Sequence, residues 1–138
     1  MGRVLAVDYG EKRIGLALSD ETKTIASGLA VIPMAGIART ARTIAALVTE
    51  REVERIIVGN PISMKGRDTK LSLQAQAFKT VLENVVKVPV ELVDERFTTA
   101  IAERCLHEAY AQVSARKHPV DKVAATILLE DYLERIRK

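Results

Sequence analysis

Acidic residues occupy three positions in this sequence where carboxylates are uncommon. Asp8 directly follows the apolar run V-L-A-V, Asp94 and Glu95 end the run V-E-L-V, and Asp121 lies within an apolar segment near the C-terminus. A carboxylate placed against apolar surface is unfavourable unless it is hydrogen-bonded, paired or bound to a cation. These acids are therefore the first candidates for a chemical role.

Asp8 has two interpretations. It ends the first apolar run, shortly before Gly10. Asp and Gly both favour turns, so Asp8 is explained equally well as a strand-end residue that shapes the turn toward Gly10. The alternative is a ligand held at the edge of the core. The sequence around Asp8 is compatible with both interpretations.

Asp94 and Glu95 are adjacent, and side chains alternate along an extended chain. One of the two should therefore point into a site and the other away from it. We favour Glu95 as the inward one. Arg96, which follows, either pairs with a neighbouring acid or contacts a phosphate.

Asp121 gives the clearest signal of the three. Its segment is predicted to be a helix that Pro119 opens, because proline is well tolerated in the first turn. The polar face of this helix carries Lys122, Thr126 and Glu130. By i, i+4, i+7 spacing, Asp121 instead shares a face with Ala125, Leu128, Leu129 and Tyr132. An acid in the first turn is also favoured by the helix dipole and can cap the helix, but capping does not require an apolar face.

Three converging carboxylates suit a hard cation, either Mg²⁺ or Mn²⁺. Two such ions about 4 Å apart activate a water and stabilise the leaving oxygen in phosphoryl chemistry. The single cysteine, Cys105, excludes an internal disulfide and a cysteine-built metal site. With only two histidines, His107 and His118, no Ser-His-Asp or Cys-His nucleophile set is evident.

The elements that must position these acids follow from the apolar patterning. Three strands in a row favour an antiparallel meander, and the later alternation of helix and strand favours parallel strands with crossover helices. Ligands collect outside the carboxyl ends of such strands. We expect a mixed five-stranded α/β sheet with helices on both faces, built from a hairpin at 3–20, strands at 25–32, 53–58 and 88–93, and helices at 37–48, 71–85, 98–109 and from 119 onward.

Length and composition set the remaining expectations. A chain of 138 residues with 48% hydrophobic and 28% charged residues predicts one globular domain over 1–138. The net charge of +3 permits a polyanionic partner without demanding one. No apolar run approaches the length of a membrane span, and the cysteine content fits a reducing compartment. We expect a soluble cytoplasmic protein with no membrane partner.

Four segments together resemble the YqgF family of ribonuclease H-like nucleases, which is linked to Holliday junction resolution and to maturation of the 5′ end of pre-16S rRNA. The matching segments are V-D-Y-G-E-K-R-I-G-L-A-L-S-D (7–20), V-G-N-P-I-S-M-K-G (58–66), V-D-E-R-F-T-T (93–99) and V-D-K-V-A-A-T-I-L-L-E-D-Y-L (120–133). The resemblance implies a ribonuclease H-like sheet of order 3-2-1-4-5 with strand 2 antiparallel. It also implies a metal site made by Asp8, Glu95 and Asp121.

The middle segment departs from the family pattern at two positions. The family usually has an aliphatic residue at position 60 and an acid at position 65, where this chain has Asn60 and Lys65. These positions concern substrate contact more than metal binding.

Basic residues flank the implied site, and the resemblance assigns them to the phosphate backbone of a nucleic acid. They are Lys12, Arg13, Lys65, Arg67, Arg116 and Lys117, joined by Arg96. As a set they match the footprint expected of a nucleic-acid-binding surface, whereas each one taken alone is better explained as a solvated surface charge. Three Tyr, two Phe and no Trp argue against a base-stacking platform, so recognition of a nucleic acid should rest on its backbone and shape.

The leading hypothesis is a metal-dependent nuclease that acts on structured nucleic acid, with an rRNA precursor as substrate. The second is a junction resolvase, which cuts two DNA strands symmetrically as a two-fold dimer; a monomer and a homodimer both stay open. A third is a nucleotide-binding module, since D-x-G-x-x-x-x-G at 8–15 also resembles the phosphate loop of actin-like ATPases. A fourth is a factor that binds nucleic acid without cleaving it.

Overall fold

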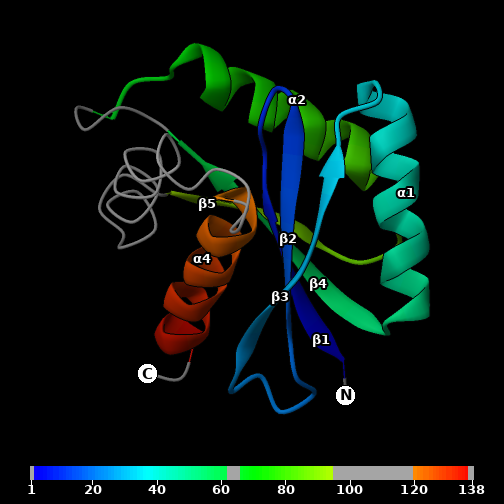
Figure 1. The fold of residues 1–138 in the computed structure, drawn as a ribbon, viewed down its shortest axis with the longest axis vertical. Coiled ribbons are helices and arrows are strands. Elements are labelled where there is room, and N and C mark those ends of the chain that lie inside the picture. The colour runs from blue at the N-terminus through cyan, green and yellow to red at the C-terminus, as the bar shows by residue number, and fades with distance from the viewer. Residues whose placement is uncertain (1, 62–65, 95–119, 137–138) are drawn as a thin grey trace.

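The computed structural model describes residues 2–61, 66–94 and 120–136, with the backbone alone for 120–123. Eight helices and strands lie within these ranges (Figure 1). They are β1 (Arg3–Asp8), β2 (Arg13–Ser19), β3 (Ala26–Pro33), α1 (Ile37–Glu50), β4 (Val53–Asn60), α2 (Lys70–Glu83), β5 (Val90–Asp94) and α4 (Val120–Ile136).

The strands form one mixed sheet in the order β3-β2-β1-β4-β5. β2 runs antiparallel to both of its neighbours, while β1, β4 and β5 are parallel to one another. The predicted order and the antiparallel second strand are both confirmed. Parallel strands bring their carboxyl ends to one edge, so β1, β4 and β5 all finish on the same side of the molecule.

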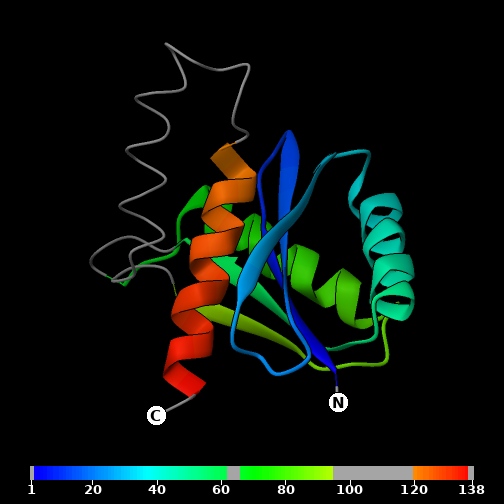
Figure 2. The same ribbon diagram turned by 60° about the horizontal axis from the view of Figure 1, so that its bottom comes forward.

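The sheet separates two apolar layers. Side chains alternate along β1: Leu5 and Val7 pack into one buried cluster, whereas Val4 and Ala6 pack into another. The first cluster includes residues of α1 and α2, and the second includes residues of α4. Figures 1 and 2 show the same arrangement, with α1 and α2 covering one face and α4 lying across the other. Helices on both faces were expected.

α4 is held to the sheet mainly by leucines. Leu128, Leu129 and Leu133 are fully buried, together with Ala125. Burying a leucine side chain contributes about 1.5–3 kcal/mol, so this row is the main anchor of the last helix. The Tyr132 hydroxyl adds a hydrogen bond to Glu91 near the start of β5, at 3.3 Å.

α2 starts with a reciprocal capping arrangement. The Thr69 hydroxyl accepts a hydrogen bond from the Ser72 backbone N–H, and the Ser72 hydroxyl accepts one from the Thr69 N–H. The Thr69 hydroxyl also donates to the Pro61 carbonyl at 3.0 Å. These contacts satisfy helix donors that have no partner inside the helix, and they tie the start of α2 to the residue that follows β4.

Observed boundaries differ from the predicted ones by a few residues. β4 continues to Asn60, two residues past the predicted end, and α2 stops at Glu83, so Val85 lies beyond it and is exposed. The helix predicted at 98–109 and the polar loop predicted at 112–118 lie outside the described residues. Within the described residues, no helix is both long and apolar enough to cross a bilayer.

Candidate functional site

Asp8 is the last residue of β1 and only 3% of it is exposed. It lies opposite Gly15 of the antiparallel strand β2. By alternation with Val4 and Ala6, it belongs to the face of the sheet that α4 covers. A carboxylate in this position is buried at the edge to which the parallel strands run, which is where ligands collect in such sheets.

The first turn of α4 lies toward the same end of the molecule as Asp8. Tyr132, near the C-terminal end of α4, contacts the beginning of β5 through Glu91. The helix rises about 16 Å from residue 121 to residue 132, whereas β5 extends only about 10 Å from Glu91 to Asp94. The N-terminal turn of α4 therefore reaches the carboxyl ends of the strands, as Figure 2 shows. Asp121 is in that turn, and its side chain lies outside the described residues.

Asp94 lies on the opposite face from Asp8. It ends β5 and pairs in register with Asn60 of β4. Its predecessor Val93 packs under α4, so Asp94 is directed toward the face of α1 and α2. Glu95 lies outside the described residues, so the choice of Glu95 over Asp94 stays a prediction.

The turn between β1 and β2 depends on close packing at Gly10. A Cβ atom at this position would clash with the backbone carbonyl oxygen of Arg13. The turn presents Lys12 and Arg13 as exposed residues next to the end of β1. The Lys12 carbonyl accepts a hydrogen bond from the Met34 N–H at 2.9 Å, so the backbone that carries this basic pair is held in place.

Glu11 braces the same turn against α2. Its Oε2 atom accepts a hydrogen bond from the Gln74 amide at 3.1 Å and lies 3.6 Å from the Lys70 ammonium group. The turn is therefore supported on two sides, by α2 and by the segment that follows β3. Sequence reasoning missed this role, because nothing in one sequence distinguishes Glu11 from an ordinary surface acid.

Tyr9, the residue after Asp8, belongs to the buried core. Tyr9 is buried and packs against Phe78 of α2 with ring centroids 5.4 Å apart. Burial raises the pKa of the Tyr9 hydroxyl, and the charge of Glu11 adds to that rise. Tyr9 thus stays neutral at physiological pH and serves as packing for the strand end that carries Asp8.

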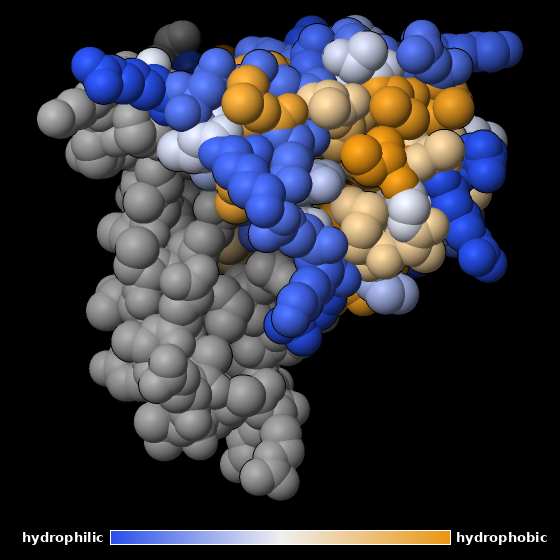
Figure 3. Space-filling model, turned by 90° about the horizontal axis from the view of Figure 1, so that it is seen from above, coloured by the Kyte–Doolittle hydropathy of each residue, from blue (hydrophilic) through white to orange (hydrophobic). Residues whose placement is uncertain are grey.

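The other predicted basic residues are only partly described. Arg67 is exposed and follows Gly66, which adopts a φ of 80°. Lys65, Arg96, Arg116 and Lys117 lie outside the described residues. Figure 3 looks onto the end of the molecule where β1 finishes, and hydrophilic side chains cross this face beside a hydrophobic patch.

The part of the chain that the structure describes contains no group of three or more His, Cys, Asp or Glu residues that could hold a metal. That search does not reach Glu95 or the side chain of Asp121. Of the predicted triad, the structure thus describes the Asp8 side chain and the backbone of the helix turn that carries Asp121.

Comparison with known proteins assigns the family. Residues 2–135 match the sequence model of RuvX, described as a Holliday junction resolvase. The chain belongs to the RuvX family. A relative from Chloroflexus aggregans is 40% identical over 134 residues, covering 97% of this chain and 94% of its own length. One from Dictyoglomus thermophilum is 39% identical over 132 residues, covering 96% and 95%. Both are named "Putative pre-16S rRNA nuclease".

Solved structures confirm the ribonuclease H-like fold of this RuvX member. RuvC from Thermus thermophilus, in complex with a Holliday junction substrate, has a TM-score of 0.63 at 14% identity, covering 99% of this chain and 96% of RuvC. The fowlpox virus resolvase, in complex with Holliday junction DNA, has a TM-score of 0.58 at 15% identity, with 99% of both chains covered. At such identities the likeness shows the fold alone. Family membership itself makes the chain a nuclease-type hydrolase, in agreement with the leading hypothesis and not with an actin-like ATPase module.

Proposed function

We propose that this RuvX member hydrolyses phosphodiester bonds in structured nucleic acid with the help of Mg²⁺ or Mn²⁺, and that Asp8, Glu95 and Asp121 are the metal ligands. The observation that carries the proposal is the buried carboxylate of Asp8 at the carboxyl edge of the sheet. A second acid, Asp121, belongs to the first turn of α4 at the same end of the molecule, and a divalent cation bound by both carboxylates would offset the repulsion between their charges.

The donor set fits the proposed ion. Three carboxylates supply only hard oxygen ligands, which suit Mg²⁺ and Mn²⁺ better than softer metals. Such an ion, when bound, supplies an activated water and neutralises charge that develops on the phosphate. The chain's own part is to hold the carboxylates rigidly at the strand end and at the start of α4.

The exposed pair Lys12 and Arg13 has the proposed role of orienting the substrate. The braced turn places these residues beside Asp8, where they are suited to contact phosphates on either side of the scissile bond. Arg67, Lys65, Arg96, Arg116 and Lys117 are the proposed remainder of the footprint. Contacts of this kind position a nucleic acid without reading its sequence.

The proposed substrate is the 5′ end of pre-16S rRNA, and the proposed setting is ribosome biogenesis in the cytoplasm. The support is the name that the relatives at 34–40% identity share. They match over nearly the whole chain.

Asp8→Asn tests the catalytic proposal most directly. The amide keeps the size of the carboxylate and removes the charge that holds the ion. Cleavage of an rRNA precursor in Mg²⁺ should fall by at least about 100-fold, the upper end of the loss caused by removing a mere supporting residue at a metal site. EDTA should stop the wild-type enzyme, and added Mg²⁺ or Mn²⁺ should restore it.

Asp94→Asn is the matched control, because it makes the same change at the same edge on the other face of the sheet. It should cleave at close to the wild-type rate, whereas Glu95→Gln and Asp121→Asn should behave like Asp8→Asn. Wild-type cleavage by Asp8→Asn would refute the assignment. If that variant also restored precursor maturation in cells, the protein would act as a non-catalytic binding factor.

A junction resolvase is the second candidate. It is favoured by the family description and by the likeness in fold to two resolvases in complex with junction DNA. A resolvase must cut two strands symmetrically, which requires a two-fold dimer. Sedimentation of the protein with a four-way junction, followed by mapping of the cuts, decides between the candidates. Paired symmetric cuts by a dimer support resolution, and a monomer that cuts only the rRNA precursor supports rRNA processing.

A further inference from the structure

A pocket lies at the other end of the sheet from Asp8. It is a pocket of about 350 Å³ between the β2–β3 ribbon and the end of α1. Arg3, at the opposite end of β1 from Asp8, forms part of its wall. A strand of this length separates the two residues by about 17 Å. The pocket is therefore distinct from the proposed metal site, and its size is in the range of small-molecule sites.

An irregularity in β3 shapes the floor of this pocket. Leu16 pairs with Ala30 and Ala17 pairs with Gly28, so Leu29 has no partner on β2. An extra residue of this kind bends its strand. Leu29 and Leu18 both pack toward the core shared with α1, and both line the pocket. The floor is therefore apolar.

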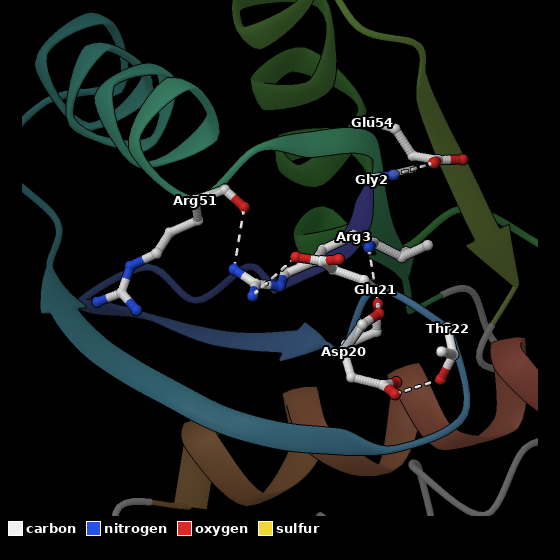
Figure 4. A network of polar contacts seen from close by, with 9 residues as sticks. Gly2, Arg3, Asp20, Glu21, Thr22, Arg51 and Glu54 are labelled. Carbon is white, nitrogen blue, oxygen red and sulfur yellow. Dashed lines mark hydrogen bonds and ion pairs between the residues drawn. The ribbon is translucent and has the colours of Figure 1, made fainter.

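Two arginine residues from different elements line the wall. Arg3 begins β1, and Arg51 caps the C-terminal end of α1. The Nη1 atom of Arg3 donates to the Arg51 carbonyl at 3.3 Å, and its Nη2 atom lies 3.7 Å from the Glu21 carboxylate. Figure 4 shows the Arg3 guanidinium between these two groups. Arg51 itself lies 3.5 Å from Glu50, and its side chain is 43% exposed.

The acid that lines the pocket is already engaged within its own loop. Asp20 Oδ1 accepts hydrogen bonds from the backbone N–H groups of Thr24 and Ile25, at 2.8 and 2.9 Å, and Oδ2 accepts one from the Thr22 hydroxyl. The carboxylate is thus turned into the loop that joins β2 to β3. The pairs with Glu21 and Glu50 are solvent-exposed, and exposed pairs of this kind contribute little. A phosphate group, which carries more charge than a carboxylate, can displace Glu21 and Glu50 from the two arginines.

We propose that this pocket binds a phosphate monoester of nucleotide size, with the phosphate on Arg3 and Arg51 and the nucleoside over Leu18 and Leu29. Guanidinium groups bind phosphate oxygens in pairs of parallel hydrogen bonds. Ile25, 62% exposed at the rim, covers the apolar side of the ligand. The ligand is either a free nucleoside monophosphate or the 5′-phosphorylated end of a nucleic-acid strand, which share the same chemistry.

The test is a calorimetric titration of the full chain in EDTA, so that binding is measured without cleavage. The probes are AMP, UMP and a pair of short single-stranded oligonucleotides with a 5′-phosphate or a 5′-hydroxyl end. A phosphorylated oligonucleotide that binds more tightly than its hydroxyl partner identifies a strand end. Binding of the mononucleotides with no difference between the oligonucleotides identifies a free nucleotide. Either conclusion holds only if replacing Arg51 weakens the measured binding.

Arg51→Gln should weaken that binding by at least about tenfold, as expected for loss of a charged hydrogen bond. The backbone carbonyl of residue 51 remains, so Arg3 keeps its contact and the end of α1 should stay folded. Arg42→Gln removes the same charge from an exposed position on α1 and should bind like the wild type. Glu21→Gln should bind more tightly, because it removes the competing carboxylate.

Three results would overturn the proposal. They are no binding of any of these probes at millimolar concentration, equal affinity in Arg51→Gln and the wild type, or equal weakening in Arg42→Gln and Arg51→Gln. A circular dichroism melt of each variant confirms that the fold is intact. None of these readouts depends on the metal site, so failure here leaves the proposed nuclease activity untouched.

Discussion

Gly10 tolerates no side chain, because a Cβ atom would clash with the Arg13 carbonyl oxygen. Gly10→Ala should therefore force the β1–β2 turn to shift, at a cost of about 1–3 kcal/mol. Urea unfolding measures the loss of stability. Cleavage per folded molecule should fall as well, since the turn carries Lys12 and lies next to Asp8.

Gly36→Ala is a control with a similar energetic penalty elsewhere. Gly36 adopts a φ of 84° with no atom within 4 Å of an added Cβ, so alanine there adds backbone strain of about 1–2 kcal/mol without a clash. It should lower stability and leave cleavage per folded molecule unchanged. Equal cleavage by the two variants would show that the turn geometry does not matter for the reaction.

Asp20 makes part of the stability depend on pH. The Ile25 N–H, the Thr22 hydroxyl and the Thr24 N–H all stabilise its charged form and hold the pKa of Asp20 far below its usual range. A carboxyl with a depressed folded-state pKa stabilises the fold above its unfolded pKa of about 3.9, and this stabilisation is lost as the pH falls below that value.

Asp20→Asn should therefore be less stable than the wild type at pH 7, and the difference should shrink below about pH 4. The amide oxygen still accepts hydrogen bonds but carries no charge. Urea unfolding of both proteins over this pH range measures the difference. A difference that stays constant with pH would mean that the charge of Asp20 does not contribute.

Among the elements, α2 depends on its N-terminal capping arrangement. Thr69→Ala removes the acceptor for the Ser72 N–H and the donor to Pro61, and loss of such a cap costs about 1 kcal/mol. The midpoint of thermal unfolding should fall by about 3–5 °C for a chain of this size. Thr80→Ala is the matched control, because its hydroxyl bonds only the Gln76 carbonyl within the same helix; its midpoint should stay close to the wild type.

Elements with strong periodicity were predictable from the sequence. The stripe from Ile37 to Val48 marks a helix that buries one side. The apolar runs of β1 and β4 mark strands that are buried on both faces. The strand order followed from the family resemblance, whereas the order of the predicted helices and strands alone gave a mixed five-stranded sheet. That residues 1–138 form one domain stays a prediction.

The parts that could not be predicted depend on contacts between distant residues. Glu11 meets Gln74 across 63 positions, and Arg3 meets the carbonyl of residue 51. Neither contact produces a repeating pattern of residues in the sequence, because each one joins a single surface side chain to a single partner. For Asp8, burial was predictable from the apolar run before it, whereas the roles of Glu95 and Asp121 remain proposals.

The whole protein carries a net charge of +3. For nucleic-acid binding, the positions of the basic residues should matter more than this total. If Lys12 contacts a phosphate, its neutralisation should lower the slope of log affinity against log salt by about one. Lys12→Gln and Arg42→Gln change the net charge equally, so a filter-binding series over salt in EDTA separates local contact from overall charge. Equal slopes for the two variants would show that only net charge counts.

The position of α4 in the sequence also affects how the chain folds while it is being synthesised. Val4, Ala6, Ala17 and Ile57 are covered by α4, which comes from the last part of the chain. A ribosome takes roughly ten seconds to add the residues between β1 and α4. Throughout that interval the nascent sheet can pack against α1 and α2 on one side, but the helix that packs against the other side has not been made. These apolar residues of the sheet lack their partners on α4, and remain available to molecular chaperones, until residues 120–136 have left the exit tunnel.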